Sequence, residues 1–307
     1  MNSIPDRFHF SSRLAGGVVS TVLEDAQQGR VAAVFRSTFY VDTPAGLFCV
    51  GNEALTPSPL NLVTAAPVRT DWRASGVRRG TAVRVSAGDI KIGGCFSFCY
   101  SNAARWTPAP LPRSWTTMDL ERGLQAFRRQ VRICVPEDGF GRFLVSGTVT
   151  CGGSTLTDAA RYSVSGARAW IAAAIAGGKK SAGDCVWVRS LSGFGPGLTP
   201  SGDDFIGGAM IALRALGEHE ICDRIWSETQ RQSDIRSNPI SYAHLRAASD
   251  GEGCAAIHDF LNHVVTGQTS RVADSLADVT GIGHSSGWDV VVGMEAVLDG
   301  RLRADRR

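Results

Sequence analysis

The residues best suited to do chemistry in this sequence lie within GPGLTPSGDD, residues 195–204. Gly195 and Gly197 allow positive φ angles and let a ligand approach the main chain without meeting a Cβ atom. The positions that follow supply hydroxyl groups, backbone N–H groups and carboxylates: Thr199, Ser201, Gly202, Asp203 and Asp204. Such a loop, running into an apolar helix, can hold an anion at the helix start and move a proton there.

A second copy of this arrangement lies at HSSGWD, residues 284–289. Residues 284–298 align without gaps on residues 199–213, so that Ser-Gly-x-Asp, a later glycine and a closing leucine coincide. We interpret the copies as two related helix starts, and we expect Gly207, Gly208 and Gly293 to let the helices pack closely around one shared pocket. The second copy offers a candidate general base followed by four candidate ligand-binding residues: His284, Ser285, Ser286, Gly287 and Asp289.

Each copy also has an interpretation that involves no ligand. Ser201 and Ser286 would be N-caps, and Asp204 and Asp289 at position N3 would accept a hydrogen bond from the N–H group of the cap. Asp203 has a tryptophan as its counterpart in the second copy, so it is the carboxylate most available for function.

Carboxylates at a helix start oppose an anionic ligand. Repulsion between a carboxylate and an anion about 4 Å apart costs roughly 4 kcal/mol at an effective dielectric constant near 20. The helix dipole stabilises a bound anion by only about 0.3 to 2 kcal/mol. Three solutions stay open: the carboxylates turn to their own backbone, a cation lies between them and the ligand, or one carboxylate is protonated and acts as an acid or base. If that cation is Mg²⁺, its candidate ligands are Asp203 and Asp204.

The rest of the chain divides at a proline-rich stretch, WTPAPLPRSW, residues 106–115. We predict an α+β fold, with a β-rich barrel or sandwich domain over 1–110 and a mainly helical domain over 111–307. The strand signals cover 31–35, 38–43, 46–50, 81–87 and 94–100, with a hairpin turn at 42–46. Helices are predicted near 120–131, 158–176, 205–216, 221–229, 241–251, 254–265 and 270–279, with Ser241 as an N-cap, and a strand is predicted over 186–191.

Composition argues against several classes of protein. A net charge of +3 with scattered arginines does not favour binding to nucleic acid. No apolar run approaches the roughly 20 residues of a membrane span, and no signal-peptide segment begins the sequence, so we expect a cytoplasmic protein. The eight cysteines contain no CxxC pair and are expected to be reduced core residues. The P-loop and GxGxxG patterns are missing from the sequence.

The runs GPGLTPSGDDFIGG and GIGHSSGWDVVVGM resemble a bacterial family, long described as uncharacterised, that includes the third subunit of oxamate carbamoyltransferase from anaerobic allantoin degradation. ISYAHLRAASDG also fits, and the resemblance extends over most of the chain from about Gly17. It implies interconversion of oxalurate and phosphate with oxamate and carbamoyl phosphate, or of another small acid, in an assembly with other kinds of subunit. The catalytic group would comprise Asp203, Asp204 and His284, with Asp203 or His284 as the base.

Two alternatives remain beside this transferase subunit. The first is a stand-alone hydrolase or lyase that acts on a small acidic metabolite with Mg²⁺ or Mn²⁺, and turnover without metal would exclude it. The second is a non-catalytic assembly subunit, for which an Asp203→Ala variant would leave the whole complex fully active.

Overall fold

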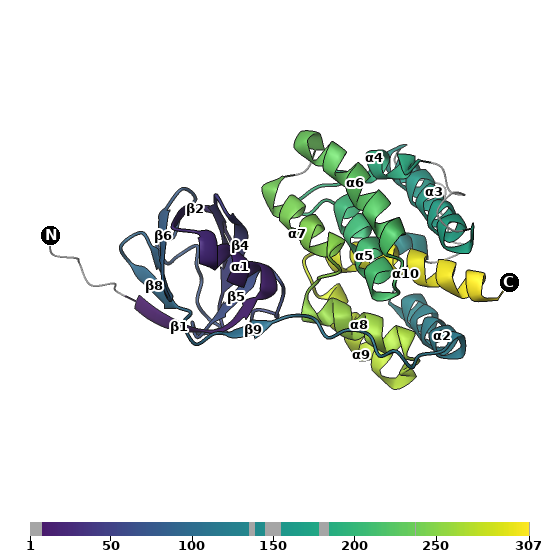
Figure 1. Cartoon of the computed structure of the whole chain (residues 1–307), viewed down its shortest axis with the longest axis horizontal. Coiled ribbons are helices and arrows are strands. Elements are labelled where there is room, and N and C mark those ends of the chain that lie inside the picture. The colour runs from purple at the N-terminus through teal and green to yellow at the C-terminus, as the bar shows by residue number, and fades with distance from the viewer. Residues whose placement is uncertain (1–7, 135–138, 145–154, 178–183, 237, 307) are drawn as a thin grey trace. The chain divides into compact units, whose positions relative to one another are not determined.

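A computed structural model describes residues 8–134, 139–144, 155–177, 184–236 and 238–306. The chain forms two compact units, Met1–Pro108 and Ala109–Arg307, and the boundary between them falls within the proline-rich stretch. The first unit consists mainly of strands and the second of helices, so the α+β fold class is confirmed (Figure 1).

The first unit is a closed β-barrel. Its strands follow the order β5-β4-β3-β2-β6-β7-β8-β1, and a further pairing between β5 and β1 closes the ring, while β9 pairs with the far end of β1. The elements of this unit, in chain order, are β1 (Phe8–Gly16), α1 (Gly17–Asp25), β2 (Gln28–Val34), β3 (Thr38–Thr43), β4 (Gly46–Gly51), β5 (Asn61–Thr64), β6 (Ala82–Ser86), β7 (Asp89–Ile92), β8 (Phe96–Cys99) and β9 (Ala104–Trp106).

Alternating side chains explain why these segments form a barrel. In β6, Val83 and Val85 are buried whereas the residues on either side of them are exposed, as a half-buried strand requires. Trp72 is fully buried and packs edge-on against Phe39, with ring centroids 5.1 Å apart. All five predicted strands and the β3–β4 hairpin are present, and the hairpin ends at Gly46, whose φ of 144° favours glycine.

The sequence analysis missed the elements that close the barrel. The first half of β1 pairs in parallel with β8, and its second half pairs antiparallel with β5. The short helix α1 follows at once and buries Val19, Val22 and Leu23. A nine-residue helix with several valines gives a weak helical signal, because β-branched residues favour strands.

The regular elements of the second unit are all helices, in the residues that the structure describes. It contains α2 (Thr117–Ile133), the 3₁₀ turn η1 (Phe140–Leu144), α3 (Thr155–Gly177), α4 (Val186–Leu191), α5 (Ser201–Ala215), α6 (His219–Arg236), α7 (Pro239–Ser249), α8 (Ala255–Val265), α9 (Thr269–Thr280) and α10 (Ser286–Asp305). Every predicted helix is found. The strand predicted over 186–191 is wrong: α4 buries Trp187, Val188 and Leu191, and a short apolar run does not by itself distinguish strand from helix.

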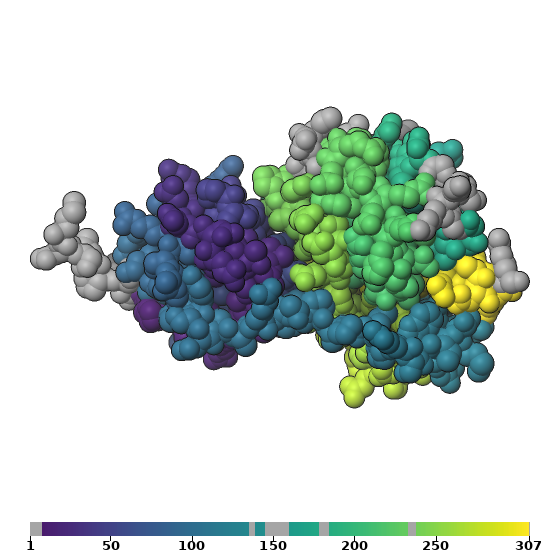
Figure 2. Space-filling view, in the orientation of Figure 1, coloured from purple at the N-terminus to yellow at the C-terminus, as the bar shows by residue number. Residues whose placement is uncertain are grey.

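Helices α5 and α10 form the centre of this unit, and the other helices surround them (Figure 1). Eleven residues of α5 are buried. The C-terminal end of α10 reaches the surface, where it is seen in yellow in Figure 2. Among the helices in the described ranges, none combines the length and the hydropathy needed to cross a bilayer.

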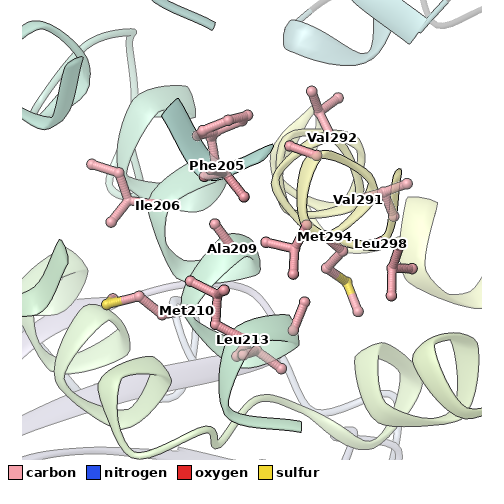
Figure 3. Close-up of a cluster of buried hydrophobic side chains, with 14 of the residues drawn as sticks. Phe205, Ile206, Ala209, Met210, Leu213, Val291, Val292, Met294 and Leu298 are labelled. Atoms are coloured by element: carbon pink, nitrogen blue, oxygen red, sulfur yellow. The ribbon is translucent and has the colours of Figure 1, made fainter. Parts of the chain in front are cut away.

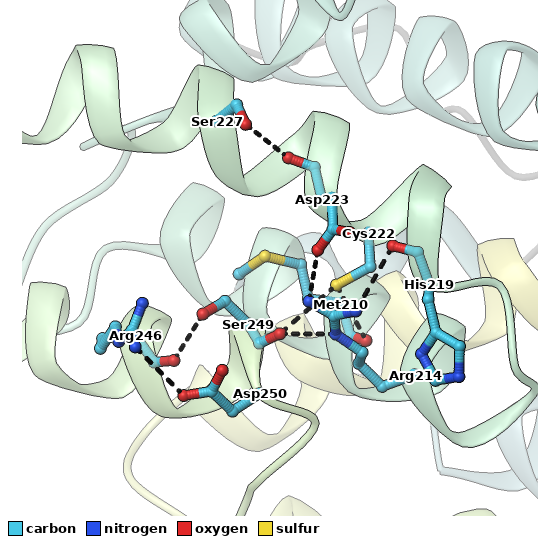
Figure 4. A network of polar contacts seen from close by, with 9 residues as sticks. All are labelled: Met210, Arg214, His219, Cys222, Asp223, Ser227, Arg246, Ser249 and Asp250. Carbon is cyan, nitrogen blue, oxygen red and sulfur yellow. Dashed lines mark hydrogen bonds and ion pairs between the residues drawn. The ribbon is translucent and has the colours of Figure 1, made fainter. Parts of the chain in front are cut away.

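Polar contacts fix the C-terminal end of α5 to its neighbours (Figure 4). The Arg214 guanidinium donates from Nε to the carbonyl of Ser249 on α7, at 2.6 Å, and from Nη2 to Asp223 on α6, also at 2.6 Å. The Cys222 thiol lies 3.7 Å from the same Ser249 carbonyl. These contacts fix the C-terminal end of α5 in place. The helix therefore forms a rigid support for the residues at its N-terminal end.

The cysteines are less uniform than the sequence predicted. Cys49, Cys185 and Cys222 are buried core residues with free thiols, whereas Cys95 and Cys134 are exposed. Cys151 lies outside the described residues.

A candidate site where two helix starts meet

Helices α5 and α10 pack through a reciprocal pair of glycines. A Cβ atom on Gly208 would lie 2.1 Å from the carbonyl oxygen of Val290, and one on Gly293 would lie 2.0 Å from that of Phe205. Each glycine therefore lets the opposite backbone approach closely, and apolar side chains of both helices gather around the contact (Figure 3). Gly207 takes no part, because its nearest neighbour is Ala248 at 3.7 Å.

The turns that precede α5 and α10 have the same pattern of backbone hydrogen bonds. The carbonyl of Leu191 accepts the N–H of Phe194, and the carbonyl of Phe194 accepts the N–H of Gly202. The second copy makes the same two bonds, from Ile282 to Val279 and from Gly287 to Ile282. Gly202 and Gly287 also pack against the carbonyls that begin each turn, since an added Cβ would lie 1.8 Å from the oxygen of Leu191 and 1.9 Å from that of Val279, respectively. The sequence repeat is thus a repeated helix–turn–helix unit.

The two helix starts touch each other. The hydroxyl oxygen of Thr199, just before α5, lies 3.0 Å from that of Ser286, the first residue of α10, although 87 positions separate them in the chain. The predicted caps are wrong: Pro200 and Ser285 occupy the N-cap positions without a side-chain capping bond, so Ser201 and Ser286 are the first helical residues. Their hydroxyls are therefore available to the opposite helix.

Asp204 and Asp289 receive hydroxyl groups from across the contact. Burial raises the pKa of Asp204 well above its usual range; the hydroxyls of Ser286 and Thr199 act against this shift, while the charge of Asp289 adds to it. Burial also raises the pKa of Asp289, opposed by the Phe140 N–H and the hydroxyls of Ser201 and Ser285. Each helix thus presents its first serine to the aspartate of the other helix, and neither aspartate is in the capping box that the sequence predicted.

Asp203 has a structural role that the sequence analysis did not predict. It is buried, at 2% exposure, and Oδ1 accepts the N–H of Gly193 at 2.8 Å. Its Oδ2 accepts the hydroxyl of Ser241 on α7 at 2.6 Å. The expectation that Asp203 is the carboxylate most available for function is therefore wrong, because both its oxygens hold the glycine loop against α7.

The glycine loop is exposed and conformationally specialised. Gly195 and Gly197 have φ angles of 111° and 101°, which favour glycine, and both are exposed. However, the N–H groups of Gly202 and Gly287 already donate to carbonyls of their own turns. Two of the backbone donors expected to bind an anion therefore have partners within the protein.

The histidines lie differently from the carboxylates. His284 is exposed, just before the N-cap of α10. His244, on α7, is partly buried, and burial lowers its pKa to about 4, so this imidazole is neutral at physiological pH. The structure thus places one histidine of the candidate group at the surface beside the second helix start.

Three residues near the site were missed or misassigned from sequence. The N–H of Phe140 in η1 donates to Asp289 Oδ1 at 2.5 Å, across 149 positions. Ser241 binds Asp203 rather than capping α7, and Asn238 is the N-cap of that helix. The Asn238-Pro239 pair is a strong N-terminal signal that the sequence analysis passed over, whereas nothing local links Phe140 to Asp289.

The predicted magnesium ligands, Asp203 and Asp204, lie in the first turn of α5. In the ranges that the structure describes, no three His, Cys, Asp or Glu side chains come together in a group that could hold a metal ion. Asp203, one of the two proposed ligands, uses both oxygens for hydrogen bonds within the protein. Asp203 and Asp204 thus have no third His, Cys, Asp or Glu ligand beside them among the described residues, and magnesium binding at this pair stays a prediction.

The barrel has a cavity of 470 Å³ between α1 and the ends of β6 and β8. Its polar lining includes Ser20, Glu24 and Gln27, and the hydroxyl of Tyr100 in the same wall donates to the carbonyl of Ser86 at 2.9 Å. Among the described residues that line it, there is no lysine, arginine or histidine. This cavity therefore lacks the cationic groups that usually bind phosphate or carboxylate.

Comparison with known protein families shows which family the chain is related to. Residues 191–298, which include both helix starts, match the family described as oxamate carbamoyltransferase subunit AllH. Residues 10–105, the barrel, match the AllH family N-terminal domain. The chain belongs to the AllH family. No solved structure matches it. The match to the helical unit spans α5 to most of α10, so the repeated helix–turn–helix unit lies within the AllH region.

Proposed function

We propose that this AllH chain is a subunit of an oxamate carbamoyltransferase, or of a close relative that acts on another small acid, and that the joined starts of α5 and α10 form its reaction site. The family match gives the class of enzyme. One observation supports the location: Asp204, whose pKa is raised by burial, lies where two otherwise distant helix starts meet.

The reaction needs a group that can hold and release a proton. When phosphate attacks the carbamoyl carbon of oxalurate, a C–O bond forms, the C–N bond breaks, and the leaving nitrogen of oxamate takes up one proton. In the reverse direction the same proton must be removed from a weakly nucleophilic amide. A carboxyl group with a raised pKa can do both near neutral pH, so Asp204 is the acid–base residue in this proposal.

Other groups at the helix starts would bind the substrate. The hydroxyls of Thr199 and Ser286 lie at the contact, and the exposed glycines Gly195 and Gly197 leave the backbone of the loop open to a ligand. In this proposal Asp203 holds the loop in place through its bonds to Gly193 and Ser241. His284 stays a candidate at the edge of the site because it precedes α10 and is exposed.

The test uses the chain assembled with the other subunits of its enzyme. Carbamoyl phosphate formed from oxalurate and phosphate is measured for the wild type, Asp204→Asn and His284→Ala, with the exposed Asp259→Asn as matched control. We expect Asp204→Asn to lower turnover about 10² to 10⁴-fold while the control is unaffected. Full turnover of Asp204→Asn would exclude an acid–base role and favour a non-catalytic assembly subunit.

The isolated chain provides a second test. Its melting temperature is measured with phosphate, carbamoyl phosphate, oxamate and oxalurate, singly and in pairs. A ligand at a hundredfold excess over its Kd stabilises the native state by about 2.7 kcal/mol. A shift that Thr199→Ala with Ser286→Ala removes supports a site on this chain. No shift with any of them would favour a site owned by another subunit.

A further inference from the structure

We propose that the cavity in the first unit binds a small organic cation, with an ammonium or guanidinium head beside Glu24 and an apolar part against the barrel side chains. The cavity has a volume of 470 Å³, within the range of about 300 to 1,000 Å³ that is usual for small-molecule sites. This site goes beyond the proposed function, because its described lining residues all belong to the first unit, whereas α5 and α10 belong to the second.

Hydrogen bonds between neighbouring elements fix the walls of the cavity. The carbonyl of Gln27, just after α1, accepts the N–H of Val85 on β6 at 2.9 Å. The Tyr100 hydroxyl donates to the carbonyl of Ser86, at the end of the same strand, also at 2.9 Å. The carbonyl of Tyr100 accepts the N–H of Ala103 at 3.0 Å. The cavity is therefore formed before a ligand arrives, which lowers the cost of binding.

The hydroxyl groups that line the cavity use their protons inside the protein. Ser20 donates to the carbonyl of Gly16 at 3.1 Å, and Ser86 donates to the carbonyl of Asp89 at 3.3 Å. The proton of the Tyr100 hydroxyl is used in its bond to Ser86. A hydroxyl group has one proton to donate, and its oxygen can still accept. These hydroxyls can therefore accept hydrogen bonds from a ligand but have no proton left to donate.

The C-terminal end of α1 adds negative charge beside these acceptors. Leu23, Glu24 and Ala26 line the cavity, and the carboxylate of Glu24 is on an exposed side chain that a ligand can reach. A helix ends in unpaired carbonyl groups and the negative end of its dipole, which favour a cation. All nine residues of α1 are described, and its last turn contains no basic residue but ends in Glu24 and Asp25. A bound cation would supply the positive charge that this helix end lacks.

Groups that would bind an anion are scarce around the cavity. Once the hydroxyl protons are assigned, the side-chain amide of Gln27 is the one side-chain donor left among the described residues that line it. Leu23, Val85 and Ala103 give part of the lining an apolar surface. A strongly hydrated inorganic ion gains nothing from such a surface, whereas a hydrocarbon chain is stabilised by burial there. The lining therefore favours a ligand with a cationic, donor-rich head and an apolar part.

Binding to the purified full-length chain tests this proposal. Four probes of similar length differ in their head groups: butylammonium, butylguanidinium, butyramide and butyrate. We expect the two cations to bind with a Kd about tenfold or more below that of butyramide, because a hydrogen bond to a charged group is stronger than one between neutral groups. The amide NMR shifts that they cause should gather at Glu24, Gln27, Val85 and Ala103. Butyrate binding as tightly as the cations, shifts confined to the second unit, or no binding by either cation would overturn the proposal.

Two neighbouring acids at the end of α1 provide a matched pair of variants. Glu24→Gln keeps the shape of the side chain but removes its charge, so the Kd of butylammonium should rise about tenfold. Asp25→Asn removes the same charge from a side chain that is also exposed but does not line the cavity, and it should change this Kd by less than about twofold.

Equal effects of the two substitutions would indicate a general attraction to acidic surface and would contradict a site that contacts Glu24. Both side chains are exposed, so neither substitution is expected to prevent folding. Neither titration measures turnover, so the result is independent of the function proposed for the helical unit.

Discussion

The side chain of Asn238 joins two parts of the site. Its Oδ1 caps α7 by accepting the N–H groups of Ile240 and Ser241, each at 3.0 Å. Its Nδ2 donates to the carbonyl of Leu198 in the glycine loop, 2.5 Å away and 40 positions earlier in the chain. One amide thus starts α7 and holds the loop that precedes α5.

The two functions of Asn238 can be separated by substitution. Asn238→Ala should cost about 0.5 to 2 kcal/mol of unfolding free energy, the usual loss for an N-cap. Asn238→Asp keeps the capping oxygen but loses the donor to Leu198, so we expect near-normal stability with faster amide exchange over the glycine loop. Urea unfolding and hydrogen exchange measure the two effects. Equal loop protection in the wild type and Asn238→Asp would contradict the contact.

The glycine contact between α5 and α10 gives a prediction with an internal control. Gly208→Ala and Gly293→Ala each place a Cβ within about 2 Å of a carbonyl oxygen, so we expect losses of at least 1 to 3 kcal/mol. Gly207→Ala, one position away, meets only Ala248 at 3.7 Å and should gain up to about 1 kcal/mol from helix propensity. The melting temperatures of the three variants, compared with that of the wild type, test these predictions. Similar melting temperatures for all three would show that the helices are not in this contact.

Stability should depend on pH through Asp204. Burial raises the pKa of its carboxyl in the folded state, so the folded chain binds more protons than the unfolded chain between the unfolded value of about 3.9 and the raised folded value. The stability contributed by the bound proton is therefore complete below about pH 4 and is lost as the pH rises through the folded pKa. Asp204→Asn should flatten this part of the curve. Unfolding free energies over the acid-to-neutral range check it, and an equal slope in the variant would be the contrary result.

The bond between Asp203 and Ser241 should be a structural coupling. Asp203→Ala and Ser241→Ala each leave a buried polar group without its partner, so each should cost about 1 to 3 kcal/mol. The double variant should cost less than the sum, with a coupling energy of roughly 0.5 to 3 kcal/mol. Urea unfolding of the four proteins gives this cycle. Additive losses would show that the hydroxyl and carboxylate do not interact.

Much of the fold could be predicted from sequence because its signals are local. Alternating apolar residues mark β6, and capping residues and helical spacing mark α2, where Thr116 and Asp119 form a capping box. The elements that were missed depend on distant partners. β1 is defined by its pairing with β8 and β5, and α4 by burial of Trp187 and Leu191 among other helices.

At the site, too, the features set by local sequence were predicted and those set by distant residues were not. The repeat of Ser-Gly-x-Asp correctly predicted that α5 and α10 are related and packed together, because the glycines that permit it are visible in the sequence. The roles of the carboxylates were not visible. Asp203 is held by Ser241, 38 positions away, and Asp289 by Phe140, 149 positions away, so no local pattern could assign their partners.

The position of α10 in the chain has a consequence for synthesis of the protein. The strands of the barrel end at Trp106, so the first unit has all its strands before the helical unit is made. Helix α5, in contrast, packs against α10, which is the most C-terminal of the described helices. Because a growing chain emerges from the ribosome N-terminus first, the buried face of α5 must wait uncovered until α10 is translated. Ribosome-bound chains that stop before Ser286 should therefore expose apolar surface to chaperones.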